Sequence, residues 1–565
     1  MPAGCETMNI RKIIRFICFI LLHSPIPFSA AAENFTNALH VSAEPVFPGV
    51  NWERETNGLS PETIRGVDAF VHTLDTTGLM VAKNGRVVYQ YGDVKRLSYL
   101  ASSRKSVLSM LYGANAASGK IRLDATLKEL GMSDVSGLLP IEERAKVIDV
   151  ITARSGIYHP VTQGIGLLYE LRFSACPGVS RPAAENEPSW APKRGSQEPG
   201  THWRYFNWDF NTAGAVFERL TGKNIFDALR DDLAIPIGMQ DFDRERQQKS
   251  GDQTRSQYPA YHMVLSTRDM ARLGLLMLRQ GKWRDRQIIP AEWVRRSTSV
   301  RTSLDELHRA GSVEIDRFGY GYLWWVWDGP LATGPYQGAY TSLGSYGQYI
   351  TILPALDMVV AHKSCPPGDV SQSDYFRLLD LLTGKQPAST AELASWPPLR
   401  TKVHAQPKEH IAIKLDPKIY DAYAGQYVMA PDPKLQGTVT MAIKRDGDAL
   451  YRQVPGWFAQ AIFPESETVF FNATEDEQLT FIKNDKGEVT GVIVEQNGTF
   501  GESGRKELAQ GSRDGRSSAG DVSLRNYEIR HGESGQGNRP KDQEIFHGQR
   551  VAHDQFERGE IPEWR

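Results

Sequence analysis

ASSRKS, residues 101–106, opens a predicted helix whose apolar residues follow with helical spacing. Ser102 and Lys105 are three residues apart and therefore share one face of that helix. A serine at a helix N-terminus lies at the positive end of the helix dipole, which favours an alkoxide and a nearby oxyanion. A neutral lysine one turn later can take the hydroxyl proton, which requires burial or nearby positive charge. Taken alone, S-x-x-K is better explained as a polar helix cap.

Two further motifs follow along the chain. Tyr205-Phe206-Asn207 precedes a predicted helix over 212–221; a tyrosine can relay a proton, and an asparagine can hold a carbonyl or a lysine. TSLGSYGQ, residues 341–348, leads into a β-branched run, and a glycine-rich strand edge lets a substrate approach the backbone closely. Each alone is typical of ordinary structure, namely a packed aromatic beside a helix cap and a glycine-rich turn before a hairpin.

In this order, the three motifs resemble those of the serine β-lactamase and penicillin-binding-protein superfamily, which carries S-x-x-K, then Y-x-N or S-x-N, then a K-T-G or H-x-G strand. The resemblance is to the class C β-lactamase-related branch, which includes esterases, D-amino-acid peptidases and 6-aminohexanoate-dimer hydrolase. It spans about residues 60–365, with further similar stretches at 151–157, 236–242, 265–280, 287–296, 319–325 and 347–362. It implies an α+β fold, in which an antiparallel sheet is flanked by helices and the site lies between the sheet and an all-helical subdomain.

The resemblance also implies a role for each motif residue. Ser102 would be the acylated nucleophile and Lys105 the base that activates it. Tyr205 would act as general acid or base together with Lys105, and Asn207 would hydrogen-bond both the substrate and Lys105. The oxyanion hole would consist of the backbone N–H groups of Ser102 and Ser345.

The third motif departs from the family pattern. Ser342-Leu343-Gly344 stands where the family has a lysine or histidine triad, so Ser342 replaces a cation that helps β-lactamases bind the carboxylate of the drug. A serine lacks that charge, and a hydrogen bond to a charged group contributes about 1.5–3 kcal/mol. The change favours neutral esters or amides over β-lactams, unless Arg204 supplies the charge. Tryptophans near the second and third motifs favour an apolar pocket; they are Trp203, Trp208, Trp324, Trp325 and Trp327.

We therefore expect a serine hydrolase that cleaves ester or amide bonds of small molecules through an acyl-enzyme on Ser102, with neither a metal nor an organic cofactor. The sequence has no H-E-x-x-H, no paired C-x-x-C and no phosphate-binding G-x-x-x-x-G-K motif. Two alternatives stay open. One is a β-lactamase or D-amino-acid peptidase acting on cell-wall-type substrates; the other is a penicillin-binding-like protein that has lost turnover and binds peptides or glycans.

The 565 residues correspond to three to four domain-sized units. With 40% hydrophobic residues, 23% charged residues and a net charge of −2, the chain is ordinary globular protein with no drive toward nucleic acid. We expect the hydrolase domain over 45–385 and a proline-rich linker over 386–417. Residues 418–505 read as strands only, a small antiparallel barrel or sandwich that resembles the lipocalin-like domain often following this hydrolase fold. The polar tail, 506–565, should be disordered.

Residues 1–32 are predicted to be a cleavable secretory signal. Three basic residues precede an apolar run at 16–22, and Ala-Ala-Ala at 30–32 offers a cleavage site. The run is far shorter than the roughly 20 residues of a membrane-spanning helix, although an uncleaved anchor is the alternative. We expect a periplasmic or secreted protein with no integral membrane association. Its remaining cysteines, Cys176 and Cys365, could form a disulfide or stay free and buried.

Overall fold

The computed structural model describes residues 45–160, 192–251, 253–309, 316–364, 370–395, 410–429, 440–453, 459–472, 477–496 and 503–506. The predicted signal, both remaining cysteines, residues 396–409 of the linker and the tail from 507 onward lie outside these residues. Among the described helices, none combines the length and the apolar character needed to cross a membrane.

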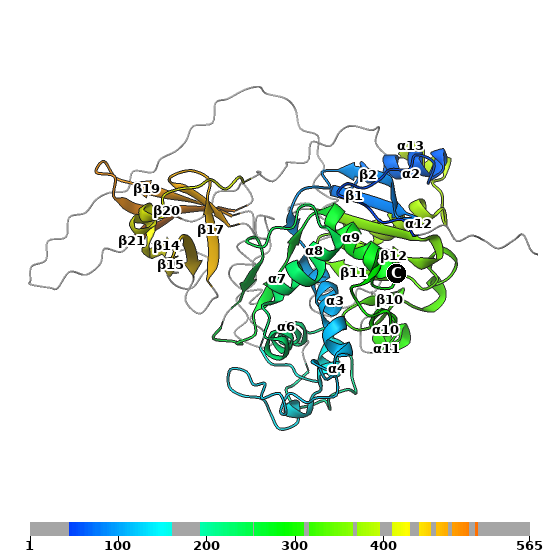
Figure 1. The fold of residues 1–565 in the computed structure, drawn as a ribbon, viewed down its shortest axis with the longest axis horizontal. Coiled ribbons are helices and arrows are strands. Elements are labelled where there is room, and N and C mark those ends of the chain that lie inside the picture. The colour runs from blue at the N-terminus through cyan, green and yellow to red at the C-terminus, as the bar shows by residue number, and fades with distance from the viewer. Residues whose placement is uncertain are drawn as a thin grey trace, which may run out of the picture. The chain divides into compact units, whose positions relative to one another are not determined.

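A seven-stranded antiparallel sheet lies at the centre of the larger domain (Figure 1), in the order β2-β1-β13-β12-β11-β10-β9. Its N-terminal hairpin therefore pairs with strand β13 from near the end of the domain. The strands are β1 (Thr76–Lys83), β2 (Arg86–Gly92), β9 (Phe318–Tyr320), β10 (Trp325–Trp327), β11 (Tyr340–Gly344), β12 (Gln348–Leu353) and β13 (Met358–Ser364). Three two-stranded pairs accompany the sheet; they are β3 (Ser98–Tyr99) with β6 (Val264–Leu265), β4 (Gln248–Ser250) with β5 (Ala260–His262), and β7 (Lys282–Trp283) with β8 (Arg286–Gln287).

The sequence Asn84-Gly85 between two apolar runs predicts a two-residue hairpin turn, and the β1–β2 hairpin confirms it. Asn84 and Gly85 both have positive φ, at 51° and 76°. Two such residues form the type I′ turn that matches the twist of antiparallel strands. The second predicted hairpin is also present, since β12 and β13 are joined by a turn that begins at Pro354.

Helices cover both faces of the sheet and build a separate helical region. The longer ones are α2 (Pro61–Val71), α3 (Arg104–Ala117), α6 (Asn207–Thr221), α9 (Thr267–Leu278) and α12 (Gln372–Thr383). The shorter ones are α4 (Val147–Ile151), α7 (Ile225–Ala228), α8 (Ile235–Ile237), α10 (Ala291–Ser297), α11 (Leu304–Arg309), α13 (Thr390–Ser395) and α14 (Tyr420–Tyr423). Ser266 caps α9 by accepting a hydrogen bond from the Asp269 amide at 3.2 Å, as the sequence predicted.

Alternate side chains of the central strands enter two different cores, which is why β11, β12 and β13 are buried along their whole length. On β12, Ile350 and Ile352 pack in the core that includes α9, whereas Tyr349 packs in the core that includes α2 and α12. Helix α9 lies close against the sheet because it carries Gly274, where a Cβ would come within 2.4 Å of Val359 Cγ1. Helix α3 starts beside β11 and continues against α6 and α10, so its first turn lies where the sheet meets the helices (Figure 1).

A closed eight-stranded antiparallel barrel follows in the chain, in the order β14 to β21. Its interior is filled by large side chains, among them Tyr427, Phe470 and Phe481. The predicted α+β fold with a following β domain is therefore confirmed, and that domain is a barrel, not a sandwich. The strands are β14 (Gly425–Met429), β15 (Thr440–Asp446), β16 (Ala449–Gln453), β17 (Gln460–Pro464), β18 (Val469–Asn472), β19 (Glu477–Lys483), β20 (Val489–Gln496) and β21 (Ser503–Lys506).

Candidate active site

Ser102 lies in a tight 3-10 turn, Ala101–Ser103, directly before α3. Ala101 has a φ of 48°, in the left-handed region that residues other than glycine rarely adopt. The Arg104 guanidinium holds this conformation by donating a hydrogen bond from Nη1 to the Ala101 carbonyl at 3.0 Å. The turn leaves Ser102 half-buried at the start of the helix, whereas both of its neighbours in the turn are buried.

Lys105 lies at the centre of the predicted catalytic residues. Its Nζ lies within hydrogen-bond distance of three groups: it donates to Asn207 Oδ1 at 2.9 Å, and it lies 3.0 Å from Ser102 Oγ and 2.5 Å from the Tyr205 hydroxyl, each of which can donate or accept. The amine also lies 4.3 Å from the centroids of the Tyr205 and Phe210 rings. The structure thus brings together four residues that the sequence spreads over more than a hundred positions.

Burial changes the protonation of both members of the lysine–tyrosine pair. It lowers the pKa of Lys105 well below the ordinary lysine value, and the charge of Arg104 lowers it further. It raises the pKa of Tyr205 to about 12, although hydrogen bonding to Ser102 and the Arg104 charge act in the opposite direction. Both effects favour a neutral amine beside a protonated phenol. A neutral amine has two donor hydrogens and one lone pair, so it can accept the Ser102 proton.

Tyr205 and Asn207 are positioned by the start of α6. The helix begins at Asn207, five residues before the predicted start, and Phe206 before it is extended, with φ −131° and ψ 124°. The Tyr205 ring stacks on Trp325 of β10, with centroids 5.6 Å apart and an interplanar angle of 24°. Trp203 lies edge-on to Trp325 at 6.1 Å. Of the tryptophans predicted to line a pocket, these two therefore lie beside Tyr205.

The other three tryptophans pack elsewhere. Trp208 donates from Nε1 to Asp134 at 2.7 Å, and Trp324 lies edge-on to Tyr340. Trp327 stacks on Tyr336 with centroids 4.1 Å apart. Their role in the described structure is packing.

The third motif lies against the turn that carries Ser102. Ser342 is fully buried, and its Oγ donates to the Ser103 carbonyl at 3.1 Å. The Ser103 hydroxyl donates to the Gln348 carbonyl, on the next strand, at 2.6 Å. A Cβ on Gly344 would come within 2.5 Å of the Leu100 carbonyl oxygen and 3.0 Å of the Ser103 amide. This close approach explains why a glycine ends β11.

Ser345 is exposed in the turn between β11 and β12, and several side chains hold that turn. Tyr346 and Gly347 have φ of 62° and 80°. The Tyr346 carbonyl accepts hydrogen bonds from Gln348 Nε2, at 3.0 Å, and from Ser364 Oγ. The Gly347 carbonyl lies 2.7 Å from Nδ1 of His362.

His362 was expected from the sequence to be structural or to line a pocket, and its contacts define a structural role in the turn. A carbonyl only accepts, so Nδ1 carries the hydrogen and Nε2 accepts from Thr76 Oγ1 at 2.9 Å. Burial lowers the pKa of His362 to about 4, which keeps the imidazole neutral. The partners of His362 come from strands far apart in the sequence, so no local motif indicated them.

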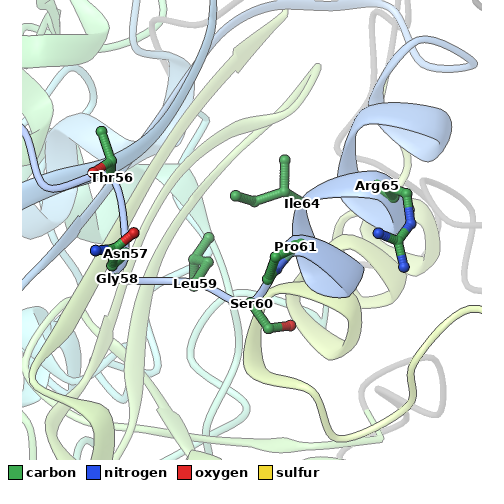
Figure 2. A pocket seen from close by; sticks show the side chains of 8 residues that line it. All are labelled: Thr56, Asn57, Gly58, Leu59, Ser60, Pro61, Ile64 and Arg65. Carbon is green, nitrogen blue, oxygen red and sulfur yellow. The ribbon is translucent and has the colours of Figure 1, made fainter.

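A surface hollow lies at the start of α2, away from these residues in the sequence (Figure 2). It is lined by residues 56–61 together with Ile64 and Arg65. None of the predicted catalytic residues lines it, and Arg65 is its single titratable side chain. Among the described residues, no group of three or more histidines, cysteines, aspartates or glutamates is placed to hold a metal ion.

Comparison with known families and structures gives one extensive match. The family described as Beta-lactamase matches residues 67–364, and a domain of unknown function, DUF3471, matches residues 409–507. No curated protein matches the chain.

Several solved structures are similar to the chain at low identity. A putative 6-aminohexanoate-dimer hydrolase from Bacillus anthracis is 21% identical, over 55% of this chain and 81% of that one, with a TM-score of 0.40. An octameric penicillin-binding protein homologue from Pyrococcus abyssi is 16% identical, over 78% and 97%, with a TM-score of 0.40. A family VIII carboxylesterase is 15% identical, over 57% and 97%, with a TM-score of 0.41. These likenesses are distant, and we base nothing further on them.

Proposed function

The chain belongs to the beta-lactamase family, whose match covers residues 67–364, and on that premise we propose that it is an exported serine hydrolase cleaving ester or amide bonds of small molecules. The reaction would proceed through an acyl-enzyme on Ser102. The observation that carries this proposal is the buried Lys105 amine, hydrogen-bonded at once to Ser102, Tyr205 and Asn207. A nucleophile within hydrogen-bond reach of a base that a third group orients is the arrangement that acyl transfer requires.

In the proposed acylation, Lys105 Nζ takes the Ser102 proton while Oγ attacks the substrate carbonyl carbon. The carbonyl oxygen becomes an oxyanion, held by the backbone N–H groups of Ser102 and Ser345. As the carbon–heteroatom bond breaks, Tyr205 gives its proton to the leaving group and regains one from Lys105. Water then attacks the acyl carbon, giving its proton to the same pair, and Ser102 leaves with a proton. Asn207 orients Lys105 and the substrate.

The substrates we propose carry no anionic group beside the scissile bond. At the position of the family's cation the chain has Ser342, whose hydroxyl already donates to the Ser103 carbonyl. The half-buried Trp325 ring, stacked on Tyr205, adds an apolar surface beside the proposed proton donor. Both features support neutral esters or amides over β-lactams and D,D-peptides. Arg204, the other candidate cation, lies near Tyr158; burial raises the pKa of that phenol to about 12, and the charge of Arg204 partly offsets the rise.

Export and location belong to the same proposal and rest on sequence alone. The basic residues, short apolar run and Ala-Ala-Ala of residues 1–32 support secretion to a periplasm or beyond the cell. The partner we propose is a small-molecule substrate, since a net charge of −2 supports no nucleic-acid binding.

Intact-mass spectrometry after treatment with a fluorophosphonate tests the proposal. We expect one adduct on the wild-type protein and none on Ser102→Ala. Ser109→Ala is the matched control, because Ser109 is buried on the same helix and its hydroxyl has no hydrogen-bond partner in the described structure. Hydrolysis of p-nitrophenyl esters, D-amino-acid amides and nitrocefin then sorts the substrate class. A folded wild-type protein that takes up no adduct would favour a binding protein without turnover.

A further inference from the structure

Arg104, the residue before the lysine base, is a buried cation with little to compensate it. Its side chain is 1% exposed. Nη1 donates to the Ala101 carbonyl, but in the described part of the chain Nε and Nη2 have no hydrogen-bond partner. None of the ion pairs among these residues includes Arg104; its guanidinium instead lies 5.3 Å from the centroid of the Tyr261 ring. Burying an incompletely paired charge is strongly unfavourable, so its retention needs a reason.

A second buried arginine in the same domain has more hydrogen-bond acceptors around its guanidinium than Arg104 has. Arg272 on α9 is also 1% exposed. It donates to three backbone carbonyls, those of Ile237 at 2.9 Å, Gly49 at 2.8 Å and Val50 at 3.0 Å. Both Nη atoms of Arg272 thus donate to backbone carbonyls and only its Nε is without a partner in the described structure, whereas Arg104 has a partner on Nη1 alone.

The groups around the Lys105 amine leave Arg104 as the main charge acting on it. The amine itself contacts Ser102, Tyr205, Asn207 and the Phe210 ring, none of which is ionised near neutral pH. The titratable groups around this cluster are phenols and one carboxyl, namely Tyr99, Tyr205, Tyr261, Tyr320 and, next to Tyr320, Asp209. Burial raises the pKa values of Tyr205, Tyr261 and Tyr320, which keeps those phenols neutral; it also raises the pKa of Asp209, whose two carboxyl oxygens accept hydrogen bonds from Ser155.

We propose that Arg104 is a positioning residue whose uncompensated charge disfavours a second positive charge on Lys105 and whose hydrogen bond holds Ala101 in the conformation that presents Ser102. The inference rests on the proposed function and gives a role to a residue at an unspecified position of the S-x-x-K motif. Two like charges in a buried site repel strongly because the local dielectric constant is low. Together with the burial of Lys105 itself, the charge of Arg104 therefore favours the neutral form of the base.

The test measures the rate of fluorophosphonate labelling of Ser102 against pH in three variants. Arg104→Gln keeps a donor for the Ala101 carbonyl without the charge, Arg104→Met removes both, and Arg104→Lys keeps the charge. We expect the acid-side midpoint to move upward by roughly one pH unit in the Gln and Met variants, which slows labelling about tenfold at pH values below the wild-type midpoint. The Lys variant should keep the midpoint of the wild-type protein.

Arg272→Met is the matched control, read by the same labelling and by thermal unfolding. It should lower Tm, because three carbonyls lose their donor, and leave the midpoint unchanged. Arg104→Met should lower Tm less, since it removes an unfavourable burial. The inference is overturned if folded Arg104→Gln keeps the wild-type midpoint, a result that stands even where the Met variant does not fold. A wild-type protein that is not labelled at any pH would instead contradict the proposed function.

Discussion

The amine of Lys105 and the hydroxyl of Tyr205 lie 2.5 Å apart, one on α3 and the other just before α6. Burial pushes their pKa values in opposite directions, lowering that of the lysine and raising that of the tyrosine to about 12. Groups coupled this closely titrate as a pair. The favoured state has its proton on the phenol and a lone pair on the amine, which is the arrangement that a base-and-donor pair needs.

The pH dependence of stability should report the lysine. Its pKa in the folded protein is lower than the ordinary value of 10.5, so between the two values the unfolded chain binds more protons. Stability therefore rises with pH across that window and is lost as pH falls toward the folded pKa. In Lys105→Met this contribution is absent. We therefore expect the Tm of the wild-type protein, relative to that of the variant, to rise as the pH is raised from 7 to 9.5. A constant difference in Tm would show that Lys105 stays charged in the folded protein.

Removing the Tyr205 hydroxyl should abolish most turnover without disturbing the fold. Tyr205→Phe keeps the ring that stacks on Trp325 and loses the proton donor. General acid–base catalysis contributes about 10²- to 10⁴-fold, so we expect a loss in kcat of that size on p-nitrophenyl esters. Tyr112→Phe is the control, because that buried hydroxyl on α3 donates only to the Ala213 carbonyl. Equal losses in both variants would assign Tyr205 to packing alone.

The glycine at the end of β11 should be sensitive to a single methyl group. In Gly344→Ala the new Cβ would meet the Leu100 carbonyl oxygen at 2.5 Å, so β11 must move away from the turn that holds Ser102. We expect labelling of Ser102 to slow by tenfold or more, since small displacements at a reacting centre are costly. Gly66→Ala on α2 is the control: its nearest neighbours would lie at 3.5 and 3.6 Å, and a glycine-to-alanine change inside a helix stabilises by about 0.5–1 kcal/mol. Unchanged labelling of Gly344→Ala would show that the strand can shift freely.

The described structure explains which parts of this site the sequence could indicate. The three motifs in their order indicated Ser102, Lys105, Tyr205 and Asn207 through the family resemblance; helix spacing by itself indicated only that Ser102 and Lys105 share a face. The same resemblance implied the antiparallel sheet flanked by helices. The left-handed Ala101 and the role of His362 depend on contacts between β11, β12, β13 and the turn before α3, which are set by strand register. No short-range sequence pattern predicts that register. The helix predicted over 212–221 begins earlier, at Asn207, whose side chain contacts Lys105 from a distant part of the chain.

His362 should make the protein lose stability in mild acid. Its pKa is about 4 in the folded protein against an ordinary 6.5, so the unfolded chain binds more protons between these values. The contribution of His362 to the free energy of unfolding therefore falls as the pH drops from 6.5 toward 4, by about 3 kcal/mol in all. Above pH 6.5 this contribution is constant. In His362→Gln this part of the acid dependence should disappear, and labelling of Ser102 should slow because the turn that carries Ser345 loses its tie at the Gly347 carbonyl. Urea unfolding at pH 4.5 and pH 7 measures the first effect; parallel curves for both proteins would contradict it.

Trp325 should decide how well the enzyme accepts aromatic substrates. Its half-buried ring stacks on Tyr205, beside the proposed proton donor, where a bound aromatic group would meet it. An aromatic pair contributes about 0.5–1.5 kcal/mol beyond area burial, so we expect Trp325→Leu to lower kcat/KM for p-nitrophenyl benzoate roughly three- to tenfold more than for p-nitrophenyl acetate. Trp327→Leu is the control, since that ring stacks on Tyr336 and not on Tyr205. A uniform loss for both esters would mean that Trp325 supports Tyr205 without contacting the acyl group, and an equal preference change in the control would assign the effect to β10 as a whole.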